Sequence, residues 1–186
     1  IAPMNYELFM GEALAEARQA AQRGAPAVGA IAVMNEAMVA RGSNRVAEAN
    51  DPTAHAVIGA IREAARKLGT THLTDVTIFT THEPCPMCVG ALFWAGARHV
   101  VFGLRASRLT RASTAPGAAP YAFTITAAEL AAATTRPPLV EGPYVEDAAG
   151  IIDRFFAEHT LSAITVTPAD FRASIEAALA SAPATR

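Results

Sequence analysis

The chain has little of what marks secreted or membrane-spanning proteins. Only two of its 186 residues are cysteine, which leaves no plausible disulfide framework. No stretch approaches the roughly 20 uninterrupted apolar residues that a membrane-spanning helix needs, so we expect no membrane partner. The first residues, Ile1-Ala2-Pro3-Met4, contain neither the basic segment nor the long apolar run of a secretory signal. We therefore expect a cytoplasmic protein.

Positive charge is also scarce. Fifteen Lys and Arg residues stand against seventeen Asp and Glu residues, which gives a formal net charge of −2 at pH 7 and an isoelectric point near 6.2. Without an overall basic field, a nucleic-acid partner would depend on a local basic patch. We therefore predict that nucleic acid is not a partner. All basic residues except Lys67 are arginine, and we attach no functional meaning to this bias.

Apolar residues are abundant. They make up 52% of the chain, and the mean hydropathy is +0.24, which excludes a disordered chain. A length of 186 residues suits one domain better than two. We predict a single domain over residues 1–186, with a core over about 5–160 and an extra C-terminal helix over about 168–180.

Helical and strand patterns alternate along the chain. Apolar residues at helical spacing predict helices over 5–23, 54–68, 85–95, 126–133, 145–159 and 168–180. Short apolar runs predict strands over 28–34, 37–41, 76–81, 99–103 and 138–141. Asn35-Glu36 joins the first two strands as a hairpin, Asp51-Pro52-Thr53 caps the second helix, and residues 107–120 form a long surface loop. This order indicates an α/β fold of three layers, α/β/α, around a mixed sheet of about five strands.

The two cysteines lie three residues apart in Glu83-Pro84-Cys85-Pro86-Met87-Cys88, at the start of a predicted helix. Both thiols can face one point near the helix N-terminus, where the helix dipole and a bound cation lower their pKa. His55, in the first turn of the preceding predicted helix, supplies a third ligand, which leaves one zinc position open for a water. Zinc makes such a water a usable nucleophile near neutral pH. A Cys-x-x-Cys pair at a strand-to-helix junction also fits a dithiol redox protein, which is the alternative for these residues.

Asp51-Pro52-Thr53-Ala54-His55-Ala56, followed by the cysteine motif, resembles the zinc-dependent cytidine/deoxycytidylate deaminase superfamily, in its branch of guanine deaminases and tRNA adenosine deaminases. The resemblance spans about residues 28–103. It implies a cytidine-deaminase-like fold, a homodimer, and hydrolytic deamination of a small-molecule aminated heterocycle, with a guanine-like purine favoured. It also implies that Zn²⁺ is held by His55, Cys85 and Cys88. The residues that it implies around the substrate base are Asn44, which hydrogen-bonds the base, and Ala56, His82 and Pro84, which line the pocket.

One position departs from the family pattern. Where the family has H-x-E, with a Glu that moves protons between water, ring nitrogen and leaving amine, this chain has Val57. Valine carries no proton, and the loss of a general acid/base lowers the rate by about 10²–10⁴-fold. We therefore predict that the chain as written is inactive or strongly impaired. Glu83 is the nearest candidate substitute, but its place in the turn favours a supporting hydrogen bond.

Several alternatives stay open. Val57 fits an engineered substitution, a natural pseudoenzyme, or an enzyme whose proton shuttle lies elsewhere. A catalytically silent zinc-binding protein that binds a base or a protein partner is the second hypothesis, ahead of a tRNA adenosine deaminase. Arg105, Arg108 and Arg111 recur every three residues where, by the resemblance, a loop covers the active-site mouth, and a solvated surface is favoured there over an anion site. Phe93 and Trp94 suit a core or a subunit contact, and His72, His99 and His159 are assigned no role.

Overall fold

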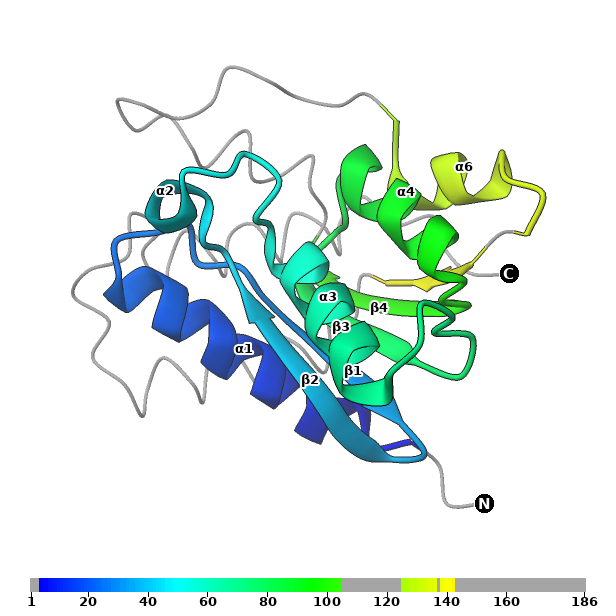
Figure 1. The fold of residues 1–186 in the computed structure, drawn as a ribbon, viewed down its shortest axis with the longest axis horizontal. Helices are drawn as coiled ribbons and strands as arrows, with labels where there is room; N and C mark the ends of the chain where they lie inside the picture. Colours follow the sequence, from blue (N-terminus) through cyan, green and yellow to red (C-terminus); the bar gives the residue numbers. More distant parts are fainter. Residues whose placement is uncertain (1–3, 105–124, 137, 143–186) are drawn as a thin grey trace, which may run out of the picture.

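The structure is a computed structural model that describes residues 4–104, 125–136 and 138–142. In chain order, its elements are α1 (Tyr6–Gln22), β1 (Gly29–Met34), β2 (Ala37–Ser43), α2 (Val46–Ala49), α3 (Ala56–Leu68), β3 (Thr77–His82), α4 (Pro86–Ala95), β4 (His99–Leu104), α6 (Ala127–Ala132) and β5 (Leu139–Glu141) (Figure 1). None of the helices in these ranges is long and apolar enough to cross a membrane. The predicted loop over 107–120, the arginines Arg105, Arg108 and Arg111, and the predicted helices over 145–159 and 168–180 lie outside the described residues.

The strands form one mixed sheet in the order β2-β1-β3-β4-β5. Strand β1 runs antiparallel to both β2 and β3, whereas β3, β4 and β5 are parallel to one another. Asn35 and Glu36 both have positive φ angles, 51° and 60°, as the tight turn between β1 and β2 requires. The predicted mixed sheet of five strands and the predicted hairpin are therefore confirmed.

The helices cover opposite faces of this sheet, and two glycines show why they approach so closely. A Cβ atom on Gly29 of β1 would lie 2.0 Å from the carbonyl oxygen of Ala13 in α1. A Cβ atom on Gly42 of β2 would lie 2.1 Å from the carbonyl oxygen of Ala56 in α3. Gly42 pairs with Ala30, the neighbour of Gly29, and successive residues of a strand face opposite sides. Helix α1 therefore forms one outer layer, and α3 belongs to the other, which confirms the α/β/α fold class.

The two faces have different cores. On the α1 face, the ring of Phe79, which is fully buried, lies 5.5 Å from that of Tyr6 and 5.4 Å from that of Phe9. The face under α3 and α4 is built mostly from small residues. Its buried members are Ala30, Ala32, Ala40, Ala56, Val57, Ile58, Ala60, Ala64, Leu73, Val76, Ile78, Cys88, Leu92, Ala95, Ala97 and Val100. Small side chains let helix backbones lie close to the sheet.

The start of α3 differs from its prediction. The helix begins at Ala56, two residues later than expected, and its N-cap is His55, whose side chain makes no capping hydrogen bond. Asp51 and Thr53 hydrogen-bond to each other in the preceding loop and do not cap the helix as predicted. The helix ends at Leu68, and its C-cap, Gly69, has the left-handed conformation expected there (φ 64°).

His99 has a structural role that the sequence did not indicate. Its Nε2 lies 2.7 Å from Oε2 of Glu141, and this contact joins the start of β4 to the end of β5. The hydroxyl of Tyr6 donates to the same carboxylate oxygen at 3.3 Å. The short edge strand β5 is thereby tied to both β4 and α1.

Candidate metal centre and its surroundings

Three potential metal ligands meet where two helices begin. His55 is the N-cap of α3, Cys85 is the N-cap of α4, and Cys88 lies in the first turn of α4. Pro86 occupies the first position of α4, where its missing N–H leaves no intrahelical bond unmade. Because α3 and α4 pack against each other, their N-terminal ends bring the three side chains together.

The distances between the donor atoms fit a zinc ion. Nδ1 of His55 lies 3.6 Å from Sγ of Cys85 and 3.7 Å from Sγ of Cys88, and the two sulfurs are 3.6 Å apart. In a tetrahedral site with bonds of about 2.3 Å to sulfur and about 2.0 Å to nitrogen, ligand atoms stand about 3.5–3.8 Å apart. Within 4–104, 125–136 and 138–142, no other group of three or more His, Cys, Asp or Glu side chains is arranged to hold a metal ion.

The three groups also influence one another's protonation. The contact with Cys88, and then that with His55, lower the pKa of the Cys85 thiol to about 4. The contact with Cys85, together with burial, raises the pKa of Cys88, and the contact with Cys85 raises the pKa of His55. One sulfur of the pair is thus favoured as a thiolate, which is the form that binds a metal.

Val57 lies beside this centre, two residues after His55 in the first turn of α3. It is buried, with 3% of its surface exposed, and belongs to the same apolar cluster as Cys88. Ala56, between His55 and Val57, is fully buried. The position at which the family pattern has a carboxylate is therefore occupied by an apolar side chain in apolar surroundings.

Glu83 lies in the turn between β3 and α4, next to Pro84, and both residues are buried. Its Oε1 accepts a hydrogen bond of 2.8 Å from the backbone N–H of Ala127, the first residue of α6. The Glu83 carboxylate therefore holds the start of α6, which agrees with the supporting role expected from the sequence.

His82 ends β3 and has 6% of its surface exposed. Its Nδ1 lies 2.8 Å from the hydroxyl oxygen of Thr81. Burial lowers the pKa of His82 to about 4, so the imidazole is neutral near pH 7. A neutral imidazole offers one donor and one acceptor.

Asn44 follows β2 and is also buried, with 8% exposed. Its Oδ1 accepts a hydrogen bond of 3.2 Å from the N–H of Val46, where the short helix α2 begins. Helix α2 was not predicted from the sequence. The only signal for α2 is the Asn44 side chain, which can hydrogen-bond the backbone two residues on. The next residue, Arg45, donates its backbone N–H to the carbonyl of Ala54 at 3.0 Å, which joins this loop to the one that carries His55.

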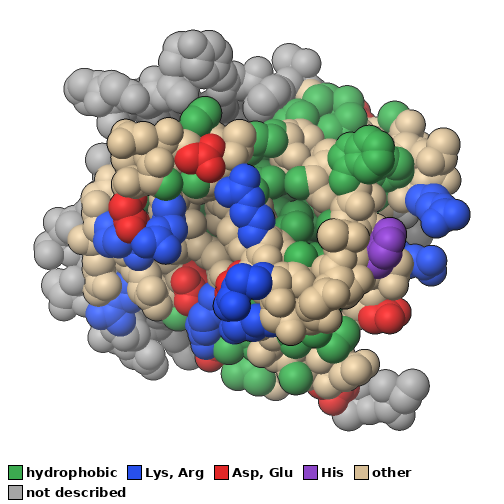
Figure 2. Space-filling view, viewed as in Figure 1, with side chains coloured by type: hydrophobic (Ala, Val, Ile, Leu, Met, Phe, Trp, Pro, Cys, Tyr) green, Lys and Arg blue, Asp and Glu red, His purple; other side chains and the backbone are tan. Residues whose placement is uncertain are grey.

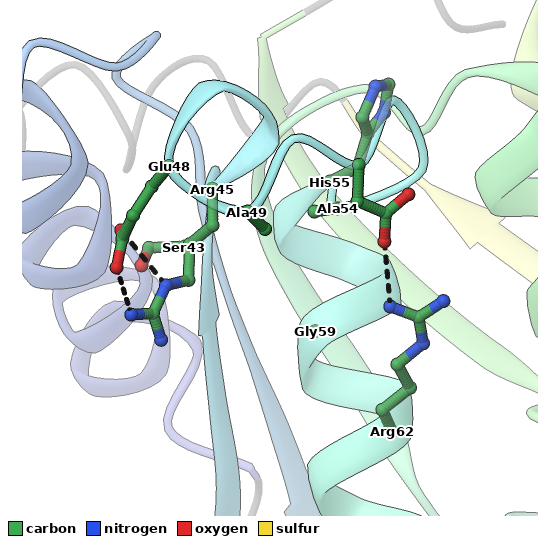
Figure 3. A pocket seen from close by; sticks show the side chains of 9 residues that line it. Ser43, Arg45, Glu48, Ala49, Ala54, His55, Gly59 and Arg62 are labelled. Carbon is green, nitrogen blue, oxygen red and sulfur yellow. Dashed lines mark hydrogen bonds and ion pairs between the residues drawn. The ribbon is translucent and has the colours of Figure 1, made fainter.

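A pocket of about 280 Å³ opens beside this loop pair (Figure 3). Its lining residues are Ser43, Arg45, Glu48, Ala49, Asp51, Ala54, His55, Gly59 and Arg62. Arg45 pairs with Glu48 on one side, and Arg62 pairs with Asp51 on the other at 3.5 Å. Neither Asp51 nor Arg62 was predicted from the sequence to be a site residue. The spacing of seven residues from His55 to Arg62, which places both on one side of a helix, is the signal that could have found Arg62.

The chain belongs to the family described as the cytidine and deoxycytidylate deaminase zinc-binding region, which matches residues 3–104. It is 42% identical over 100 residues to the guanine deaminase of Bacillus subtilis, covering 53% of this chain and 64% of that protein. It is 41% identical over 97 residues to the tRNA-specific adenosine deaminase of Bacillus subtilis, covering 52% and 60%. A probable cytosine deaminase of Schizosaccharomyces pombe is 34% identical over 152 residues, covering 80% and 90%.

Among solved structures, that of the guanine deaminase of Nitrosomonas europaea superposes with a TM-score of 0.64 at 26% identity, covering 84% of this chain and 87% of that one. The fold class and the branch expected from the sequence are confirmed, and so is the expectation of a zinc-binding domain. The chain spans less than two thirds of the length of both Bacillus subtilis relatives.

Proposed function

We propose that this chain has the scaffold of a zinc-dependent hydrolytic deaminase of a small aminated heterocycle, with His55, Cys85 and Cys88 as the metal ligands. The observation that carries the proposal is the donor triangle of 3.6–3.7 Å at the starts of α3 and α4, in a chain that belongs to a deaminase family. Zinc bound there would supply a water nucleophile that is active near neutral pH. The fourth position of a tetrahedral site, which these ligands leave open, is what hydrolysis requires.

The residues around the base carry over from the resemblance as proposals. Asn44 uses its amide oxygen for the N–H of Val46, so its amide NH₂ is the part that would donate to a ring carbonyl. His82, neutral near pH 7, would form a polar part of the pocket wall. Ala56 and Pro84 would contribute apolar contacts. A heterocycle is thus held by hydrogen bonds to its edge and by apolar contacts to its faces.

We also propose that Val57 leaves the chain strongly impaired. Deamination needs a group that moves protons to the ring nitrogen and to the leaving amine. Val57 offers none, and one oxygen of Glu83 is already held by the N–H of Ala127. These observations support a scaffold that binds its base more readily than it converts it.

A guanine-like free base is favoured over tRNA because the cations over α2 and α3 stand beside acidic side chains (Figure 2). The pairs on this and adjoining surface are Arg23–Glu48, Arg41–Glu12, Arg45–Glu48, Arg62–Asp51, Arg66–Glu63 and Lys67–Glu63. Paired cations give little attraction for a phosphate backbone.

Homodimerisation is part of the proposal. Helix α4 is apolar along its length, and Trp94 at its outer side is 83% exposed, with its ring centroid 5.7 Å from that of Phe93. Hydrophobic side chains gather over α4 in Figure 2. Exposed aromatic residues on an apolar helix are typical of subunit contacts.

The second candidate function is a catalytically silent zinc-binding protein that binds a base or a protein partner, and Val57 is the observation that favours it. The dithiol redox alternative has less support, because His55 stands as close to each sulfur as the sulfurs stand to each other.

The test is ammonia release over a panel of aminated purines, pyrimidines and triazines. It is run on this chain and on Val57→Glu, with the zinc content of each determined. Release by the Glu variant alone supports a deaminase scaffold that is impaired at one position, and the responding ring identifies the substrate. Equal release by both proteins contradicts the account of Val57. No release from either zinc-loaded protein favours the silent binding protein.

A further inference from the structure

We propose that Asp51, braced by Thr53 and Arg62, is a positioning residue that fixes the direction of His55 toward the two cysteines. The proposal rests on His55 as a metal ligand and is independent of which heterocycle is bound. Asp51 is four residues before His55, and Arg62 is seven residues after it.

The direction of His55 has to be set by the loop that precedes it. As the N-cap of α3, His55 makes no capping hydrogen bond with its side chain, whose Nδ1 faces the sulfurs of Cys85 and Cys88. Its backbone N–H donates to the carbonyl of Thr53 at 2.7 Å, and the N–H of Ala54 donates to the carbonyl of Asp51 at 3.0 Å. The residues just before His55 thus form a tight turn.

The Asp51 carboxylate holds this turn closed from inside. Its Oδ1 accepts hydrogen bonds from the backbone N–H of Thr53 at 2.8 Å and from the Thr53 hydroxyl at 2.6 Å. Hydrogen bonds to a carboxylate are roughly twice as strong as those between neutral groups. A side chain without this oxygen would remove both hydrogen bonds to Thr53, which lies two residues before His55.

Arg62 ties the same turn to the helix that follows it. From α3, its guanidinium reaches back to the loop, as Figure 3 shows, with Nη1 at 3.5 Å from Oδ2 of Asp51 and Nη2 at 3.5 Å from the hydroxyl oxygen of Thr53. These contacts are longer than those within the turn, and the Arg62 side chain is 61% exposed. Arg62 therefore acts as a brace, and Asp51 makes the larger contribution.

The consequence falls on metal affinity. Residues outside the first coordination sphere that orient a ligating His typically change metal affinity by about 10- to 100-fold when they are removed. Asp51 acts on His55 through the backbone of the loop that carries it, because the His55 imidazole faces the sulfurs of Cys85 and Cys88 and not Asp51. Loosening the turn lets His55 swing while Cys85 and Cys88 stay in place on α4.

The experiment measures the zinc dissociation constant of the full chain by competition with a chromophoric chelator, and the visible absorption of the Co²⁺-loaded protein. The variants are Asp51→Ala, Asp51→Asn and Arg62→Ala. The matched control is Arg66→Ala, because Arg66 lies one turn further along α3 and pairs with Glu63 at 2.8 Å, away from the loop.

We expect Asp51→Ala to weaken zinc binding by about 10- to 100-fold and to shift the Co²⁺ spectrum away from the two-sulfur, one-nitrogen pattern. Asp51→Asn keeps an oxygen acceptor and should restore part of the affinity. Arg62→Ala should weaken binding by about two- to fivefold, whereas Arg66→Ala should change it by less than about twofold.

Unchanged affinity and an unchanged Co²⁺ spectrum in Asp51→Ala would overturn the proposal. So would an equal loss of affinity in Arg62→Ala and Arg66→Ala, which decides the question if Asp51→Ala does not fold. A variant whose metal-free melting temperature falls while its zinc affinity stays constant assigns Asp51 a purely structural role, which also contradicts the proposal. None of these readouts depends on ammonia release, so the failure of the proposed function is a separate result.

Discussion

The two faces of the sheet differ in how they are packed and in what that packing contributes. The face under α1 holds the rings of Tyr6, Phe9 and Phe79, together with the buried alanines of α1, which are Ala13, Ala17, Ala20 and Ala21. The face under α3 and α4 is filled largely by alanine, and its helices begin with His55 and Cys85. The first arrangement contributes stability through apolar burial. The second brings helix starts close enough for three side chains to share one ion.

This difference indicates that the candidate metal centre depends on small residues where α3 packs on the sheet. Gly42 lets α3 lie on β2, because a Cβ there would meet the backbone of Ala56, the residue after His55. Gly29 lets α1 lie on β1 in the same way, but none of the candidate site residues is on α1. Equivalent packing devices therefore have different consequences on the two faces.

The largest expected effect concerns position 57, beside the metal centre on the face under α3 and α4. Val57→Glu places a proton-transfer group beside the metal centre and should raise the rate of ammonia release by about 10²–10⁴-fold. The measurement is kcat on the responding heterocycle at equal zinc content. Val57→Gln, which has a similar shape but cannot accept a proton at neutral pH, is the matched control and should stay near the original rate. A Gln variant as active as the Glu variant would contradict the role given to this position.

The next effect tests the α1 face. Phe79→Ala removes a fully buried ring and should lower the free energy of unfolding by about 3–5 kcal/mol. Urea denaturation measures this loss. Because Phe79 faces away from the metal centre, zinc bound per folded chain should stay as in the original protein. A loss of zinc affinity at concentrations where the variant is folded would show that the faces are coupled.

The third effect concerns pH. The pKa of His82 is about 4 in the folded protein, below its usual value of 6.5, so the unfolded chain binds a proton on His82 that the folded chain does not. Stability should therefore fall as pH drops from about 6.5 to about 4, by at most about 3 kcal/mol. Chemical denaturation of the metal-free protein across this range measures the slope. His82→Gln should flatten it, and an unchanged slope in that variant would assign the dependence to another group.

The smallest expected change in zinc affinity separates the two glycines. Gly29→Ala and Gly42→Ala should each destabilise the protein by about 3 kcal/mol or more, because the added Cβ would meet helix backbone at 2.0 Å and 2.1 Å. Only Gly42→Ala pushes on α3 next to His55, so only this variant should also weaken zinc binding. Thermal unfolding and chelator competition on both proteins provide the comparison. Equal zinc affinities in the two variants would contradict the claim that only the packing of α3 on the sheet affects the metal centre.

Much of the fold was predictable because its signals are local. Apolar periodicity located the sheet strands and the longer helices, and Gly69 and Gly96 ended α3 and α4 in the left-handed conformation expected of them. The start of α3 was predicted wrongly, since Asp51 and Thr53 are good capping residues that instead bond to each other. Which of two local hydrogen bonds such a residue makes depends on its neighbours in space, here Arg62.

The site was predictable to a similar extent. The spacing of Cys85 and Cys88, with His55 upstream, pointed to the one metal-binding group found among the described residues. The position of His82 in the chain gave no sign that its side chain would be engaged by Thr81, whereas the contact of Asn44 with Val46, two residues on, is of a local kind that such a residue commonly makes. The role of Glu83 at the start of α6 joins residues 44 positions apart, and no local pattern encodes such a contact.

Helices α3 and α4 start without a side-chain cap, because His55 and Cys85 occupy the capping positions and turn toward each other. A missing cap costs a helix about 1 kcal/mol. An ion bound to both residues would tether the two helix starts to each other, so its removal should let the first turns of α3 and α4 fray more readily. Frayed helix ends are where proteases cut, so the lifetime of the chain in a cell should follow the supply of metal.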